Sequence, residues 1–304
     1  MRTIYIDYSW IGEGGWIIQL SFEKYHSLGN DYLVYDCVRQ DIPLNARAIR
    51  LICDRNYGLG SDGILVGPMD WKGRIGFMTF NPDGSAAKRS GNGICIFAKY
   101  LRDSGYIQKK KFFLHTESGD VEVLFLNEEG SRMKITMGKL SFDCKDVGAV
   151  GLGEEAVNIP LLIGGSEYSI ICVSIGNSHC IIPLDEISKE RVCEIGKYLE
   201  YVSCFPDGIN TVLVKILNRN HVRMEVYERG AGYTLSAGTS SCAAVGALFR
   251  LGLLDNQTYV HAPGGEVYVS IDEDWTAHVT GRACHIGKMR LADEFITNQK
   301  LLLP

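Results

Sequence analysis

The sequence lacks the local spacings that mark the common metal and redox sites. None of its ten cysteines belongs to a CxxC pair, and its seven histidines form neither HExxH nor HxH. Zinc ribbons, thioredoxin-like pairs and helical zinc-protease motifs are thereby excluded. We therefore expect no metal ion and no cofactor. The scattered cysteines predict reduced, mostly buried thiols, as in a cytoplasmic protein.

Long apolar runs and an excess of basic charge are also missing. No stretch approaches the roughly 20 apolar residues that a membrane helix needs. The apolar patch Trp16-Ile17-Ile18 lies in a region that Asp7 and Glu13 interrupt, so a signal peptide is not expected. Lys and Arg number 31 against 36 Asp and Glu, a net charge of −5. Without a basic stripe, neither nucleic acid nor a membrane is an expected partner.

An ordinary globular composition with many glycines is what remains. The 304 residues are 46% hydrophobic and 22% charged, which suffices for a full core and suggests two domains. Glycine occurs 34 times against only 8 prolines. This ratio favours many tight turns, or loops whose backbone faces a ligand.

The two halves of the chain repeat one another. Ser27-Leu28-Gly29-Asn30 recurs 147 positions later as Ser174-Ile175-Gly176-Asn177, and Ser90-Gly91-Asn92-Gly93 answers at the same offset to Ala237-Gly238-Thr239-Ser240. Asp62-Gly63 matches Asp207-Gly208 at 145. We interpret these ordered matches as two copies of one fold. The alternative is coincidence among glycine-rich turns.

Each copy has strands and a helix that follows its glycine-rich turn. Residues 21–36 begin with the alternation of a strand, and residues 161–173 read as a hairpin turning at Gly164-Gly165. Further strands are predicted at 74–80, 121–126, 133–137, 222–228 and 267–271, and helices at 45–55, 94–103, 189–200 and 241–251. This mixture predicts an α+β fold rather than regular βαβ alternation.

The paired glycine turns are candidate ligand sites. Gly91-Asn92-Gly93 and Gly238-Thr239-Ser240 each open a predicted helix, whose first amides lack internal partners and carry partial positive charge. Two such helix starts facing each other would bind a carboxylate or a phosphate. The alternative is that each turn only caps its helix.

Other polar residues have the same two interpretations. Asn30 and Asn177 follow a glycine in both copies and are either turn formers or amides that contact an amino acid. Glu228-Arg229 is either a surface ion pair or part of the site, and its position matches Asn81 in the first copy.

These segments together resemble the diaminopimelate epimerases, amino-acid epimerases that work without pyridoxal phosphate. The resemblance covers nearly the whole chain from about Ser21 and rests on long ordered motifs, namely residues 24–31, 81–84, 90–93, 174–179, 208–210, 227–232 and 238–242. It implies two pseudo-symmetric α+β domains with the active site in the cleft between them. The expected domains are 21–137 with 286–304, and 138–285, preceded by an extension, 1–20.

The resemblance also implies the chemistry. In the family, one cysteine thiolate removes the α-proton of the amino acid and a second thiol returns a proton from the opposite face, without a cofactor. The expected reaction interconverts LL- and meso-diaminopimelate for lysine and cell-wall synthesis. A small amino acid is the expected substrate, and a homodimer the expected assembly.

This chain departs from the family at both thiol positions, where it has Ser90 and Ala237. A serine hydroxyl is a far weaker acid than a thiol, and alanine has no proton to transfer. Cys95 and Cys242 lie five residues further along their helices and are expected to be packed thiols. Two-base epimerisation should therefore fail in this chain.

Three explanations stay open. Both thiols were replaced deliberately to trap a ligand, or the chain is a natural relative that performs another isomerisation or a cyclisation on an amino-acid-like substrate. The third explanation is a non-catalytic amino-acid-binding protein on the same scaffold.

The family's ligand residues can be carried over by position. His179 and Glu228 would adjoin and tune the two thiol positions, and Arg229 would clamp a carboxylate. The substrate-binding set implied in this way is Asn30, Asn81, Gly91, Asn92, Asn177, Asn210, Glu228, Arg229, Gly238 and Thr239.

Overall fold

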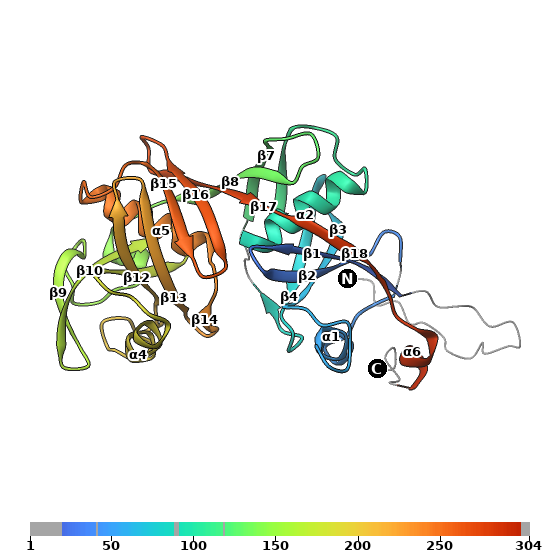
Figure 1. Cartoon of the computed structure of the whole chain (residues 1–304), viewed down its shortest axis with the longest axis horizontal. Coiled ribbons are helices and arrows are strands. Elements are labelled where there is room, and N and C mark those ends of the chain that lie inside the picture. Colours follow the sequence, from blue (N-terminus) through green and yellow to red (C-terminus); the bar gives the residue numbers. More distant parts are fainter. Residues whose placement is uncertain (1–19, 41, 88–90, 118, 299–304) are drawn as a thin grey trace, which may run out of the picture.

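The computed structural model describes residues 20–40, 42–87, 91–117 and 119–298, and these form two lobes that lie side by side in Figure 1. The first lobe contains β1 (Ser21–Ser27), β2 (Asn30–Asp36), α1 (Ala46–Cys53), β3 (Ile64–Trp71), β4 (Arg74–Phe80), β5 (Ala86–Ala87), α2 (Gly91–Asp103), β6 (Lys111–Thr116), β7 (Gly119–Phe125) and β8 (Arg132–Lys139).

The second lobe begins after β8, and the chain then returns to the first lobe. It contains α3 (Cys144–Val147), β9 (Val157–Ile163), β10 (Ser166–Ser174), β11 (Ser178–Pro183), α4 (Lys189–Leu199), β12 (Asn210–Asn218), β13 (His221–Glu228), β14 (Gly232–Thr234), α5 (Gly238–Arg250), β15 (Gln257–Ala262), β16 (Gly265–Ile271) and β17 (Thr276–Arg282). The returning segment consists of β18 (Cys284–Arg290) and α6 (Asp293–Asn298).

Both lobes have the same order of paired strands, which confirms the internal repeat and the α+β class. In the first lobe the order is β1-β2-β3-β4-β6-β7-β8, and in the second it is β10-β11-β12-β13-β15-β16-β17. The second and fourth pairings are parallel in each lobe and the others are antiparallel. The copies meet where β8 pairs antiparallel with β17. The domain bounds expected from the sequence stay a prediction.

The predicted elements are present, with differences at their ends. Helices α2 and α5 begin three residues earlier than expected, because the glycines of the turns already belong to the helices. Residues 21–36 are two strands rather than one, since Leu28 (φ 52°) and Gly29 (φ 80°) are both left-handed and reverse the chain. The hairpin at Gly164-Gly165 is confirmed by the pairing of β9 with β10.

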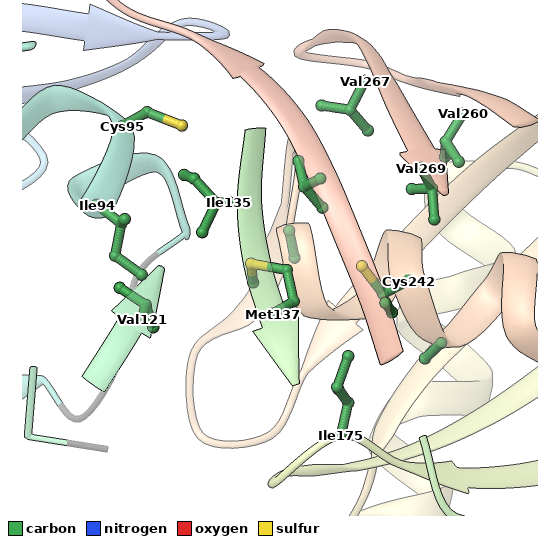
Figure 2. Close-up of a cluster of buried hydrophobic side chains, with 14 of the residues drawn as sticks. Ile94, Cys95, Val121, Ile135, Met137, Ile175, Cys242, Val260, Val267 and Val269 are labelled. Atoms are coloured by element: carbon green, nitrogen blue, oxygen red, sulfur yellow. The ribbon is translucent and has the colours of Figure 1, made fainter. Parts of the chain in front are cut away.

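One apolar core connects the two lobes. Figure 2 shows Ile94 and Cys95 of α2 on one side of Met137 of β8, and Cys242 of α5 on the other. Each of these side chains is almost completely buried. Because burial of apolar surface is the main stabilising contribution to folding, this continuous core couples the two lobes and holds the starts of α2 and α5 close together.

Helix α4 lies very close to the sheet of the second lobe. Ser188 caps its first turn, accepting a hydrogen bond from the Arg191 amide at 3.2 Å. At Gly196 the helix touches β13: a methyl group placed there would lie 2.5 Å from ring carbons of Tyr227. A glycine at this position allows the close approach.

All ten cysteines are free, and most are buried as expected. Cys95 and Cys242 are packed in the core, and burial raises the pKa of Cys95 to about 12. Within the described residues, no helix combines the length and apolarity required to cross a membrane.

Candidate active site

The starts of α2 and α5 face each other where the lobes meet. A methyl group placed on Gly91 would lie 3.6 Å from the Cα atom of Gly238. Both helices begin at these glycines, so the amide groups of two first helical turns come together. A cavity of about 10 Å³ lies between them, lined by both glycines with Ser27, Met137 and Val279. It holds about one water molecule, so an amino acid would contact the turns from outside this cavity.

The two copies bring equivalent polar pairs to the helix starts. Asn92 donates its side-chain amide to Asn30 Oδ1 at 3.4 Å in the first lobe. In the second lobe Asn177 donates to Thr239 Oγ1 at 3.3 Å. Asn30 and Asn92 are thus neighbours, as are Asn177 and Thr239, and their role in binding a substrate stays a prediction. All four remain partly exposed, so each keeps polar capacity for a ligand.

An ion-pair network holds Asn30 in its orientation. Asp62 Oδ2 accepts hydrogen bonds from the Asn30 side chain at 2.9 Å and from the Asp31 backbone at 3.0 Å. The Arg55 guanidinium forms ion pairs with Asp62 at 2.8 Å and with Asp31 at 2.6 Å. The Lys24 ammonium forms a third ion pair, with Asp31 at 2.9 Å. Both basic groups lower the pKa of Asp31 against the opposing effect of burial. The Asn30 amide nitrogen faces Asp62, which leaves its oxygen directed to Asn92.

Asn210 and Arg229 form a second polar unit in the second lobe. The buried Asn210 accepts from the Arg229 backbone amide at 2.9 Å and donates to the carbonyl of Ser178 at 2.9 Å. The exposed Arg229 side chain donates to the carbonyl of Asp207 at 2.9 Å. Its guanidinium retains further donors for a carboxylate.

His179 is fully buried beside this unit, on β11. Its Nδ1 lies 3.1 Å from the carbonyl of Asn177, so Nδ1 carries the proton and donates it. Its Nε2 is buried without a hydrogen-bond partner among the described residues. Burial lowers the pKa of His179 to about 4, assisted by the nearby Arg229. The imidazole is therefore neutral at pH 7.

Glu228 ends β13 and accepts a hydrogen bond from Thr234 Oγ1 at 2.6 Å. Burial raises its pKa, and the bond from Thr234 opposes that shift. A carboxyl group with a raised pKa is suited to hold and release a proton. No described contact joins Glu228 to His179, so their joint role at the thiol positions stays a prediction.

The remaining predicted positions differ in what the structure adds. Ala237 is 8% exposed and precedes α5 without a side-chain cap, so its methyl group lies at the helix start. Ser90 lies outside the described residues. Asn81 donates to Ser85 Oγ at 3.0 Å within its own exposed turn, and no described bond links it to the other candidate residues.

Sequence reasoning missed the residues that support the site. Asp62, Arg55 and Thr234 each hold a candidate residue or its neighbour, as described above. The repeated Asp-Gly pair at Asp62 and Asp207 was the available signal. It could have placed Asp62 near the site before the structure was known.

Comparison with known proteins gives a consistent family. The family model of diaminopimelate epimerase matches residues 22–142 and 171–286. A protein of Nostoc sp. named diaminopimelate epimerase 2 is 37% identical over 284 residues, covering 93% of this chain and 99% of its own length. The diaminopimelate epimerase of Chromobacterium violaceum is 37% identical over 255 residues, with 83% and 91% covered.

Solved structures share the fold at low sequence identity. A hydroxyproline epimerase of Agrobacterium vitis with bound trans-4-hydroxy-L-proline aligns with a TM-score of 0.67 at 16% identity, covering 91% of this chain and 94% of that one. A methylitaconate-delta-isomerase aligns with a TM-score of 0.63 at 11% identity, covering 90% and 95%. At these identities the likeness concerns the fold alone.

Proposed function

This chain belongs to the diaminopimelate epimerase family, a family of isomerases, and on that premise we propose that it binds diaminopimelate at the two helix starts but does not epimerise it. The observation that carries the proposal is the approach of Gly91 to Gly238, with a polar pair beside each. The backbone amides at the starts of α2 and α5 would then donate hydrogen bonds to one α-carboxylate, whose negative charge grows as the α-proton leaves.

The second amino-acid centre of the substrate would contact the polar unit of the second lobe. Arg229 can bind a carboxylate in a bidentate manner, because its planar guanidinium offers two parallel N–H donors. Asn30, Asn177 and Asn210 would then bind ammonium or carboxylate groups. This assignment is supported by the partial exposure of Asn30 and Asn177 and by the exposed side chain of Arg229.

Proton transfer is the step that the sequence removes. Ala237 offers no acidic atom at the start of α5, and Ser90 offers only a hydroxyl. The buried thiol of Cys95 does not replace them, because its raised pKa keeps it protonated near neutrality. The chain would therefore hold the substrate of lysine and cell-wall synthesis without inverting it.

A second candidate is an isomerisation or cyclisation with a single base. The specific observation in its favour is Glu228, whose half-buried carboxyl has a raised pKa and accepts a hydrogen bond from Thr234, three residues before Ala237. A carboxyl of this kind can take a proton from one position of a substrate and return it to another. A non-catalytic amino-acid-binding role is the third candidate, and it requires the same pocket.

One pair of measurements separates these functions. Calorimetry with LL- and meso-diaminopimelate measures binding, and NMR in D2O measures loss of the α-proton. We expect binding to the original chain with negligible exchange, and exchange after the double substitution Ser90→Cys with Ala237→Cys. Cys95→Ala is the control, since a packed thiol should not alter either result.

The contrary outcomes are distinct. Rapid exchange by the original chain would favour the single-base candidate. Absence of binding at millimolar ligand would contradict the proposed substrate, and a folded but inactive double-cysteine variant would favour the second or the third candidate. We also propose that the protein is cytoplasmic and forms a homodimer. Sedimentation of the full chain tests the oligomeric state.

A further inference from the structure

Three potential metal ligands come together on the sheet of the second lobe, where each side chain is at least partly exposed. They are His221 at the start of β13, His261 on β15 and Glu266 on β16. One ligand atom from each lies within 4.8 Å of the others. Among the described residues, no other group of three histidine, cysteine or acidic side chains brings its ligand atoms this close together.

The two imidazoles lie next to each other and share a hydrogen bond. His221 Nδ1 lies 2.9 Å from His261 Nε2, and the two rings are nearly parallel at 13°. Tyr259 stacks on His221 at 5.1 Å and holds its ring plane. On the other side of His261, Nδ1 lies 3.4 Å from the carboxylate of Glu266. Arg223, a neighbouring cation on this face, pairs with Glu225 at 3.8 Å.

The first lobe contains the equivalent cluster with one decisive difference. His115 faces Asp120 across β6 and β7 just as His261 faces Glu266 across β15 and β16. The equivalent of His221 in the first copy is Arg74, which forms an ion pair with Asp120. The strand registers agree, because Gly76 pairs with His115 where Arg223 pairs with His261.

The second copy therefore has a possible metal ligand, His221, where the first copy has the cation of Arg74. In the first lobe the Arg74 guanidinium supplies positive charge to a histidine–carboxylate pair. In the second lobe the imidazole of His221 occupies that position, so a group that can donate a lone pair to a metal ion replaces the guanidinium. A divalent cation bound between the donors would restore the missing charge.

We propose that His221, His261 and Glu266 bind a divalent transition-metal ion of the zinc class. Two imidazoles and one carboxylate are an established ligand set for zinc, with water at the fourth position. Bonds of 2.0–2.1 Å in tetrahedral geometry place two nitrogens about 3.3 Å apart, so the rings need to separate by only a few tenths of an ångström. The hydrogen bond shared by His221 and His261 is replaced by two metal bonds, with the His221 proton on Nε2 and the His261 proton on Nδ1. The exposed Glu266 carboxylate, which faces Nδ1 of His261 before the ion binds, turns to the ion as its third ligand. This inference does not depend on the proposed function.

The site lies at the base of a hairpin that contacts Leu28 of the first lobe and Leu235 of the second. Between His261 and Glu266 the chain turns through Gly264, whose amide donates to the carbonyl of Leu235 at 2.8 Å. A methyl group placed on Gly264 would lie 2.7 Å from the carbonyl oxygen of Leu28. A bound metal ion would fix this hairpin to β13 and so stabilise the segment that touches both lobes.

Metal titration of the full chain, free of tags and treated with EDTA, tests the site. Calorimetry with Zn²⁺ and the visible absorption of Co²⁺ are the two readouts. We expect one equivalent to bind, with tetrahedral Co²⁺ bands, and a higher melting temperature with Zn²⁺. His221→Arg reproduces the first copy, and it should weaken binding at least about tenfold while the metal-free protein melts at an unchanged temperature.

Matched variants make the result specific. His115→Gln removes the corresponding histidine of the first lobe and should leave the stoichiometry and affinity unchanged. His261→Gln should abolish the Co²⁺ bands, with circular dichroism reporting that the protein is folded. Absence of saturable binding by the original chain would overturn the proposal, as would equal affinity in the folded His221→Arg variant.

Discussion

The imidazole ring of His179 is ionisable and completely buried, so its protonation is coupled to folding. Its folded pKa of about 4 lies below the ordinary value of 6.5. As the pH falls, the unfolded chain therefore takes up a proton before the folded chain does. The stability that this neutral ring allows is present above pH 6.5 and is lost as the pH falls toward 4.

We expect the free energy of unfolding to fall by roughly 3 kcal/mol between pH 6.5 and pH 4 through this residue, at 1.36 kcal/mol for each pKa unit. His179→Gln removes the titrating ring and should flatten this part of the profile. Urea unfolding at several pH values measures both slopes. Identical slopes in the two proteins would contradict the assignment of the pH dependence to His179.

At the scale of single elements, the contact between α4 and β13 depends on one glycine. Gly196→Ala would place a methyl group 2.5 Å from the Tyr227 ring. Alanine favours a helix over glycine by up to about 1 kcal/mol, but overpacking costs about 1–3 kcal/mol, and a contact this short within a packed interface makes the second effect larger. We expect net destabilisation by about 1–2 kcal/mol in urea unfolding.

Lys197→Ala is the matched control, because the neighbouring Lys197 is exposed on the same helix. It should change the free energy of unfolding by less than about 0.5 kcal/mol. If Gly196→Ala were as stable as Lys197→Ala, the described spacing between α4 and β13 would be wrong.

Some features of these elements were predictable from the sequence, and others were not. Repeated motifs predicted the duplicated fold and placed Gly91 and Gly238 together, because identical backbone turns have a local signature. The left-handed Leu28 was not predicted, since leucine carries no such signal. His221 and His261 are 40 positions apart and meet only through the parallel pairing of β13 with β15, a tertiary event without a local pattern.

For the whole molecule, the shared core predicts that both lobes unfold together. Met137, Cys95 and Cys242 belong to one buried cluster that crosses the junction (Figure 2). Separate unfolding of one lobe would expose that cluster to water, which costs apolar burial on both sides. The expected outcome is a single cooperative transition.

Two tryptophans report on the lobes separately. Trp71 ends β3 in the first lobe, and Trp275 packs against Phe142 and Phe249 in the second. Two variants, in which Trp10, Trp16 and either Trp71 or Trp275 are replaced, retain a single tryptophan and should give the same urea midpoint by fluorescence. Midpoints that differ clearly would mean that the lobes unfold independently.

The pairing of β18 with β1 has a consequence for synthesis on the ribosome. One edge of β1, near the start of the chain, is completed by a strand that ends at Arg290. Until β18 emerges, that edge has unpaired backbone groups and can recruit strands from other nascent chains. Translation of the first lobe begins before that of the second, and yet its sheet is completed after the second lobe has been made, so its maturation waits until β18 has left the ribosome.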